Sequence, residues 1–128
     1  MITLLLVDDD AAIRRTLGIR LGLEPDLVIA GEADTGAAAL ALAETLQPAV
    51  VLMDVQMVGM DGITTTQMLR ARVPGTRVVI LTIYDETTLS ARARAAGASA
   101  FVAKYGQVDV LLAAIRQAAG EAEQARQD

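Results

Sequence analysis

Short runs of valine, isoleucine and leucine recur five times along the chain. The runs span residues 2–7, 27–32, 49–53, 77–82 and 100–104. The first, third and fourth are almost continuously apolar, which is typical of strands buried on both faces of a parallel sheet. The second run has fewer apolar residues and ends in Glu32, which favours a position near an edge of the sheet.

The segments between these runs carry helical patterns. Ile13, Leu17 and Leu21 fall four residues apart, and an apolar stripe at three-and-four spacing begins again at Val108. Pro48 and Gly97 are predicted to end two of the helices. The predicted helices span residues 11–23, 36–47, 63–72 and 86–96, with a fifth that begins near residues 107–109.

Strands and helices therefore alternate five times, which predicts an α/β fold. We expect a five-stranded parallel sheet with helices on both faces, joined by right-handed crossovers in a doubly wound arrangement. The expected domain spans residues 1–119. Residues 120–128 lose the apolar stripe and are interpreted as a polar tail, either a frayed helix end or the start of a linker.

Composition narrows the possible functions. Of the 128 residues, 53% are hydrophobic, and the net charge of −5 argues against a broad nucleic-acid-binding face. The chain contains no cysteine and no histidine, which excludes thiolate metal sites and Ser-His or Cys-His catalytic pairs. The absence of cysteine is compatible with a reducing cytoplasm, where we expect the protein to lie. Since the sequence shows neither a signal peptide nor a long apolar span, we expect a soluble domain with no membrane partner.

Polar residues close four of the apolar runs. Asp8, Asp9 and Asp10 follow the first run, Asp54 ends the third, and Thr82 and Lys104 end the fourth and fifth. Helix capping would explain some of these positions, and it is the favoured interpretation for Asp10. Capping alone does not explain why four strands end in mutually complementary groups. In open parallel sheets, ligands bind at these carboxyl ends of the strands, so a binding site is the better explanation for the set.

A second aspartate in the stretch "VVLMDVQMVGMDG" has a simpler explanation. Asp61 directly precedes the helix predicted from residue 63, so we expect it to cap that helix. Asp54, by contrast, ends a buried strand and needs a compensating charge.

The chemistry of the converging groups favours phosphoryl transfer. Several carboxylates in one cleft repel one another, and a hard divalent cation such as Mg²⁺ resolves that repulsion with oxygen ligands. Lys104 adds positive charge, and the Thr82 hydroxyl can hydrogen-bond an anionic oxygen. A carboxylate in these surroundings can act as the nucleophile that forms an aspartyl phosphate.

Four stretches together resemble a known family. The segments "LLLVDDD", "VVLMDVQMVGMDG", "VVILTIYDE" and "GASAFVAK" resemble the receiver domains of bacterial two-component response regulators. The resemblance covers residues 2–118, nearly the whole chain, and looks most like the NarL-type subgroup, whose members carry a C-terminal LuxR-like helix-turn-helix. It implies the flavodoxin-like or CheY-like form of the doubly wound fold.

The resemblance also implies specific roles for the acidic residues. Asp54 would be the phosphoacceptor that attacks the phosphohistidine of a histidine kinase. Asp9 and Asp54 would ligate Mg²⁺ directly, together with the backbone carbonyl of Gln56, and Asp8 would act through water. The domain would catalyse only its own phosphorylation and dephosphorylation.

The remaining implied roles concern switching. Thr82 and Lys104 would bind phosphoryl oxygens, and Phe101 would be an aromatic switch that turns inward when Thr82 moves. A plain core aromatic is an equally good interpretation of Phe101. The implied partners are a histidine kinase and a second copy of the chain on phosphorylation. DNA would be bound only through a C-terminal domain that lies outside this sequence.

Some positions depart from the usual family pattern. Val58 stands where proline is common, and Tyr105 stands where proline or aspartate usually follows the lysine. Ile83 replaces a small residue, so we expect narrower access to Asp54 and slower phosphoryl exchange. Gln56 and Tyr84 each lie two residues beyond a motif residue; they either flank the cleft and tune dephosphorylation or are ordinary loop residues.

Two other functions remain open at this point. Asp8-Asp9-Asp10 contains the D-x-D of haloacid-dehalogenase-like phosphatases, although "AAIRR" follows it in place of the expected turn. The chain could also be a phosphorylation-independent interaction module of the same fold. A dinucleotide-binding fold is disfavoured, because no G-x-G-x-x-G follows the first strand.

Overall fold

The sheet contains five parallel strands in the order β2-β1-β3-β4-β5. The computed structural model describes residues 1–57, 59–83 and 87–127. Its strands are β1 (Ile2–Val7), β2 (Leu27–Ala33), β3 (Val50–Asp54), β4 (Arg77–Thr82) and β5 (Ala100–Ala103). Its helices are α1 (Ala11–Leu21), α2 (Gly36–Leu46), α3 (Gly62–Arg72), α4 (Thr87–Ala95) and α5 (Val108–Gln127). The predicted doubly wound α/β fold is confirmed, and β2 does lie at an edge of the sheet.

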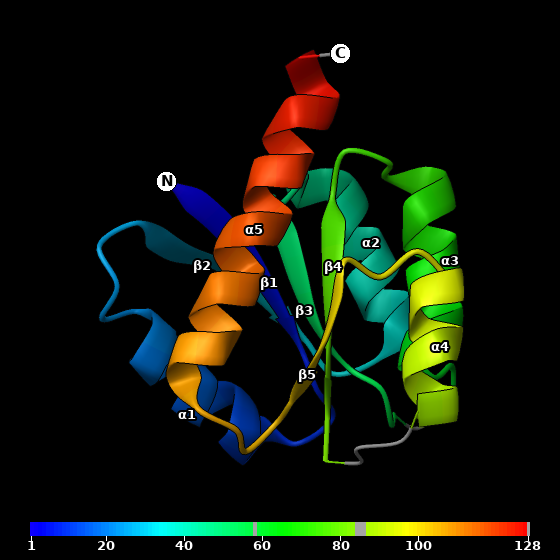
Figure 1. Ribbon diagram of the computed structural model, residues 1–128, viewed down its shortest axis with the longest axis horizontal. Helices are drawn as coiled ribbons and strands as arrows, with labels where there is room; N and C mark the ends of the chain where they lie inside the picture. Colours follow the sequence, from blue (N-terminus) through cyan, green and yellow to red (C-terminus); the bar gives the residue numbers. More distant parts are fainter. Residues whose placement is uncertain (58, 84–86, 128) are drawn as a thin grey trace.

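The helices cover both faces of the sheet (Figure 1). Helices α1 and α5 pack on one face through residues such as Leu21, Leu112 and Ile115, which form one apolar cluster. Helices α2, α3 and α4 cover the other face, where Leu40 and Leu69 belong to a second cluster. Because both faces are buried, β3 and β4 are almost wholly apolar, as the continuous runs predicted.

Local capping explains where two of the helices begin. The Asp10 carboxylate accepts hydrogen bonds from the backbone N–H groups of Ala12 and Ile13, at 2.9 and 3.4 Å. The Asp61 carboxylate accepts one from Thr64 N–H at 2.8 Å. Both aspartates are therefore N-caps, as the sequence predicted.

Helix α5 continues to Gln127 and projects past the start of the strands (Figure 1). Ala118 and Ala122 of this helix are fully buried. The Arg126 guanidinium donates a hydrogen bond to the Gln47 main-chain carbonyl at 3.4 Å. Residues 120–127 are thus helical, and this segment contacts the rest of the domain through the buried Ala122 and through Arg126.

Among the described residues, no helix is long and apolar enough to cross a membrane.

The chain passes from β1 outward to β2 and then returns past β1 to β3. The order of the strands therefore reverses between β1 and β3, which pair directly with each other. At such a switch point the loops that leave the two strands diverge to opposite faces and open a crevice at their carboxyl ends. Asp8 and Asp54 stand at this crevice.

Candidate functional site: an acidic cleft at the carboxyl ends of the strands

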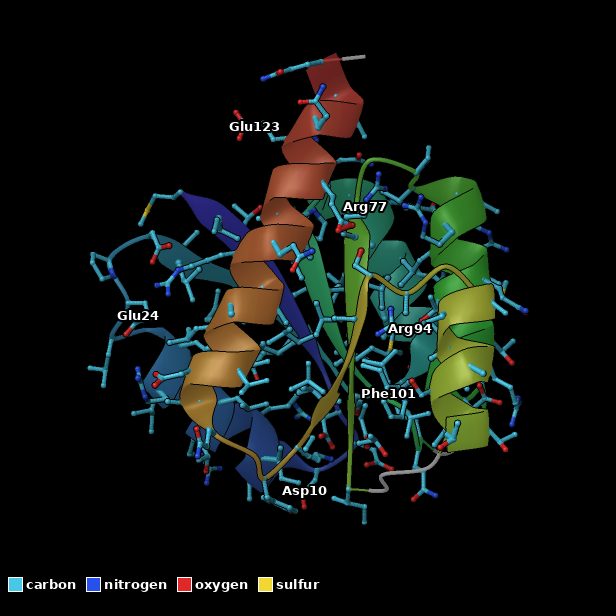
Figure 2. All side chains as sticks on the ribbon, in the orientation of Figure 1. Asp10, Glu24, Arg77, Arg94, Phe101 and Glu123 are labelled. Atoms are coloured by element: carbon cyan, nitrogen blue, oxygen red, sulfur yellow. The ribbon has the colours of Figure 1, made fainter. Side chains whose placement is uncertain are left out.

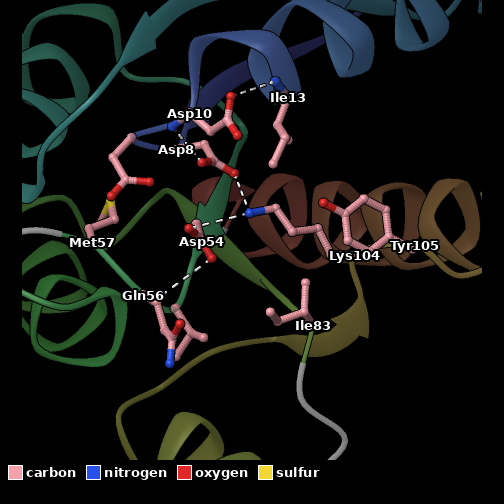
Figure 3. Close-up of a pocket in the computed structure, with 11 residues that line it drawn as sticks. Asp8, Asp10, Ile13, Asp54, Gln56, Met57, Ile83, Lys104 and Tyr105 are labelled. Atoms are coloured by element: carbon pink, nitrogen blue, oxygen red, sulfur yellow. Dashed lines mark hydrogen bonds and ion pairs between the residues drawn. The ribbon is translucent and has the colours of Figure 1, made fainter.

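A cavity opens at the predicted position, at the ends of β1, β3 and β5 (Figure 3). Its lining residues are Asp8, Asp9, Asp10, Ile13, Asp54, Val55, Gln56, Met57, Ile83, Lys104 and Tyr105. Residues from opposite ends of the sequence meet here because parallel strands bring their carboxyl ends to one edge of the sheet.

Asp8 directly follows β1 and is 2% exposed. Its Oδ1 accepts a hydrogen bond from the Asp10 N–H at 2.9 Å. Its Oδ2 lies 2.6 Å from Lys104 Nζ. Among the described residues, Lys104 is the partner of this buried oxygen, which accepts no other hydrogen bond.

Asp54 is the last residue of β3, and its side chain is 10% exposed. Its Oδ1 accepts a hydrogen bond from the Gln56 N–H at 3.3 Å, and its Oδ2 lies 3.3 Å from Lys104 Nζ. Burial and the charge of Asp8 raise the pKa of Asp54, while Lys104 acts in the opposite direction. The raised pKa means that the folded protein holds this carboxylate at a net cost.

Lys104 is the only lysine of the chain. Its side chain is 7% exposed, and its ammonium group contacts both Asp8 and Asp54. Burial lowers the pKa of Lys104, but the two carboxylates outweigh burial and leave that pKa raised. The ammonium group is therefore held in its charged form between two acids.

Three carboxylates gather at the cleft. Asp8, Asp9 and Asp54 each offer an oxygen, and these oxygens lie within 4.8 Å of one another. An all-oxygen donor set of this kind suits a hard cation. The Oδ2 of Asp8 is already in contact with the cation of Lys104, and burial together with the charge of Asp8 raises the pKa of Asp54; both observations agree with a site that accepts positive charge. The residues present therefore fit Mg²⁺.

The other residues predicted for the site occupy different surroundings. Thr82 is buried at the end of β4, and its main-chain carbonyl accepts a hydrogen bond from Lys104 N–H at 2.7 Å. Thr82 is not among the residues that line the cavity. Phe101, labelled in Figure 2, is half-buried on β5 and packs against the apolar cluster beneath α2, α3 and α4. Val58 and Tyr84 lie outside the described residues.

The rim of the cleft is apolar and exposed. Ile83 follows β4 and is 56% exposed, and Tyr105 follows Lys104 and is 77% exposed. Both side chains line the cavity (Figure 3).

Sequence reasoning missed two residues that shape the site. Gly62 begins α3, and a Cβ at this position would lie 2.3 Å from the Asp54 main-chain oxygen. Arg14 donates a hydrogen bond from Nη1 to the Asp8 main-chain carbonyl. The Asp-Gly pair before a helix was an available signal for Gly62, whereas no local pattern marked Arg14.

Comparison with solved structures defines the class of protein. A two-component response regulator of the LuxR family from Aurantimonas sp. SI85-9A1 superposes with a TM-score of 0.89 at 27% identity, covering 93% of this chain and 85% of that chain. The fold is thus that of a response regulator.

Sequence comparison identifies the family. Residues 4–116 match the family described as the response regulator receiver domain, and the chain belongs to it. It is 37% identical to the response regulator GacA of Pseudomonas aeruginosa, over 91% of this chain and 55% of that protein. It is 34% identical to the nitrate/nitrite response regulator NarL of Escherichia coli, over 91% of this chain and 54% of that protein.

These matches confirm the predicted family and its NarL-type subgroup, and they place the chain in two-component signalling. They do not favour the phosphatase alternative. The chain spans about half the length of the curated relatives it matches.

Proposed function

We propose that Asp54 accepts a phosphoryl group from the phosphohistidine of a histidine kinase. The observation that carries this proposal is the meeting of Asp8, Asp9 and Asp54 at one cleft, where the buried ammonium group of Lys104 contacts Asp8 and Asp54. A strand-end carboxylate at an open cleft, flanked by a cation, has the surroundings that a carboxylate nucleophile for phosphoryl transfer requires.

The transfer exchanges one bond for another at phosphorus. An Asp54 carboxylate oxygen forms a bond to phosphorus while the bond from phosphorus to the imidazole nitrogen of the donor breaks. The electron pair of the broken bond stays on that nitrogen, which takes a proton from water. Lys104 Nζ, 3.3 Å from Asp54 Oδ2, is placed to contact the oxygens of the group that arrives.

The proposed cofactor is Mg²⁺, held directly by Asp9, Asp54 and the Gln56 carbonyl, with Asp8 acting through water. When bound, the cation neutralises negative charge on the transferring group. The protein holds the carboxylates close together although they repel one another. Burial and the charge of Asp8 raise the pKa of Asp54 for this reason.

The proposed switch joins Thr82 to Phe101. Thr82 would move toward a phosphoryl group on Asp54, and the Phe101 ring would then turn further into the core that it already contacts. The surface formed by α4, β5 and α5 would carry the active state, including dimerisation. We propose that residues 1–119 form the receiver unit and that the last turns of α5 lead out of it.

The output and the location belong to the same proposal. The relatives GacA and NarL are named as response regulators, and about half of each lies outside the match with this chain. A DNA-binding output would reside in such a further region. A cytoplasmic location follows from a kinase donor, which takes its phosphoryl group from ATP.

Ile83 and Tyr105 are proposed to control access to Asp54. Their exposed apolar side chains stand at the mouth of the cleft. They would exclude water and small donors more effectively than a small residue at position 83, and so slow phosphoryl exchange.

The direct test is adduct formation with beryllofluoride or acetyl phosphate in the presence of Mg²⁺, followed by intact mass spectrometry for the phosphoryl adduct. One adduct is expected on the native chain and none on Asp54→Asn. Asp10→Asn is the matched control, because Asp10 caps α1 and asparagine caps helices equally well. An adduct that survives in Asp54→Asn contradicts the proposal.

The same experiments separate the alternatives. Turnover of a phosphomonoester that depends on Asp8 would support a phosphatase. A phosphorylation-independent interaction module predicts melting curves that do not change across millimolar Mg²⁺. Our proposal predicts stabilisation of about 1.4 kcal/mol at a tenfold excess of Mg²⁺ over its Kd, because only the folded cleft assembles the carboxylates.

A further inference from the structure

Arg14 connects the cleft to the neighbouring edge strand. It lies in the first turns of α1, and its side chain is 17% exposed. Its Nη1 donates a hydrogen bond to the main-chain carbonyl of Asp8, and its Nε donates one to Glu32 Oε1 at 3.2 Å. The guanidinium group therefore bridges the residue that follows β1 and a residue near the end of β2.

The carbonyl that Arg14 holds belongs to a peptide that the sheet leaves free. Strand β1 ends at Val7, and α1 begins after the Asp10 cap, so the peptide between Asp8 and Asp9 lies between these two elements. A peptide unit is planar, so fixing its oxygen fixes the direction in which the chain enters Asp9. The same contact steadies Asp8, whose two carboxylate oxygens face Asp10 N–H and Lys104.

We propose that Arg14 is a positioning residue for the acidic cluster. It clamps the Asp8–Asp9 peptide against Glu32, so that the carboxylates of Asp8 and Asp9 are aimed at Asp54 before a cation arrives. This inference rests on the proposed function to the extent that the cluster binds Mg²⁺. The clamp itself is a property of the protein without metal.

An ordinary surface ion pair does not account for this geometry. Glu32 is half exposed, and an exposed pair of this kind contributes little to stability. The bond to Asp8, however, is directed at a partly buried main-chain oxygen. Arg15 provides the contrast: it is exposed and makes no hydrogen bond or ion pair with the other residues that the structure describes, so it shares only the charge of Arg14.

The test compares Arg14→Gln, Arg14→Lys and Arg15→Gln in two assays. Isothermal titration measures the Mg²⁺ Kd well below the melting temperature, and amide hydrogen exchange measures the Asp10 N–H in metal-free buffer. We expect Arg14→Gln to weaken Mg²⁺ binding by about 10- to 100-fold, the usual effect of losing a group that orients a metal ligand. We also expect faster exchange at Asp10, whose N–H donates to Asp8 Oδ1.

The lysine variant separates positioning from charge. Lysine keeps the charge but cannot hold Asp8 and Glu32 with one planar fork, so Arg14→Lys should recover only part of the Mg²⁺ affinity. Arg15→Gln should match the native chain in both assays. Full recovery in Arg14→Lys, or an equal loss in Arg15→Gln, would reduce the effect to long-range charge and overturn the inference.

The two assays test the proposed function and the role of Arg14 separately. Absence of Mg²⁺ binding by the native chain would count against the proposed function, while Asp10 exchange would still decide the role of Arg14. Unchanged Asp10 exchange in Arg14→Gln would overturn the clamp, whatever the metal does.

Discussion

Replacing Gly62 with alanine tests how closely helix α3 packs against the main chain of Asp54. An added Cβ would lie 2.3 Å from the Asp54 carbonyl oxygen and 2.9 Å from the Val55 Cα, whereas ordinary contacts begin at 3.4 Å. Both obstacles are backbone atoms, so no side chain can rotate away. Either α3 or the end of β3 must move by about 1 Å, and overpacking of this kind usually costs about 1–3 kcal/mol.

Helix propensity offsets part of that cost. Alanine in a helix is favoured over glycine by about 0.5–1 kcal/mol. The expected net loss in the free energy of unfolding is therefore about 0.5–2 kcal/mol, or roughly 2–8 °C in Tm for a domain of this size. Gly120→Ala is the matched control, because Gly120 lies within α5 and an added Cβ meets nothing within 4 Å. That variant should gain about 0.5–1 kcal/mol.

Urea unfolding followed by far-UV circular dichroism measures both variants under the same conditions. The two substitutions are chemically identical, so opposite signs would isolate the contact at Asp54. Movement at β3 should also weaken Mg²⁺ binding in Gly62→Ala and leave it unchanged in Gly120→Ala. A Gly62→Ala variant as stable as the native chain would refute the reasoning, because it would show that the backbone yields at no cost.

Two further predictions concern the charges of the cleft. Lys104→Gln removes the cation shared by two buried carboxylates and should lower the free energy of unfolding by about 3 kcal/mol in metal-free buffer. The control Arg92→Gln, at an exposed position, should lower it by about 0.5 kcal/mol or less. Equal small losses in both variants would show that the ion pairs contribute little to stability. Asp54→Asn should be more stable than the native chain at pH 7 by about 0.5–2 kcal/mol. The reason is that the pKa of Asp54 is raised in the folded protein. As pH rises from the ordinary carboxyl range through that raised pKa, the native chain loses stability relative to this variant, and the difference persists at higher pH. Urea titrations from pH 4 to 8 without Mg²⁺ measure this difference, and a native chain more stable than Asp54→Asn at pH 7 would contradict it.

The fold could be predicted because its determinants are local. Apolar runs, helix-stopping residues and the caps Asp10 and Asp61 each depend on a few neighbouring residues. The last turns of α5 were harder to foresee. Their buried positions, Ala118 and Ala122, carry small side chains that hardly differ from an exposed alanine in sequence, and the contact from Arg126 to Gln47 exists only once the chain has folded.

The site could be predicted in part, since parallel strands bring their ends together whatever the loops do. Asp8, Asp54 and Lys104 meet as that rule requires. The sequence could not tell which of the adjacent acids would be buried. Asp8 is buried and Asp9 exposed because of the direction in which the chain leaves β1, and that direction involves Arg14 and Glu32.

The buried floor of the cleft (Asp8, Asp54 and Lys104) and its exposed rim (Ile83 and Tyr105) differ in how freely they can change during evolution. Asp8, Asp54 and Lys104 lie at buried strand ends, where most substitutions would disturb the sheet. Ile83 and Tyr105 are exposed, and substitutions at exposed positions usually change stability by no more than about 0.5 kcal/mol. Substitutions at the rim can therefore accumulate with little loss of stability while the residues of the floor stay the same. On the proposed role of Ile83 and Tyr105, the rate of phosphoryl exchange and the stability of the domain can therefore evolve as separate traits.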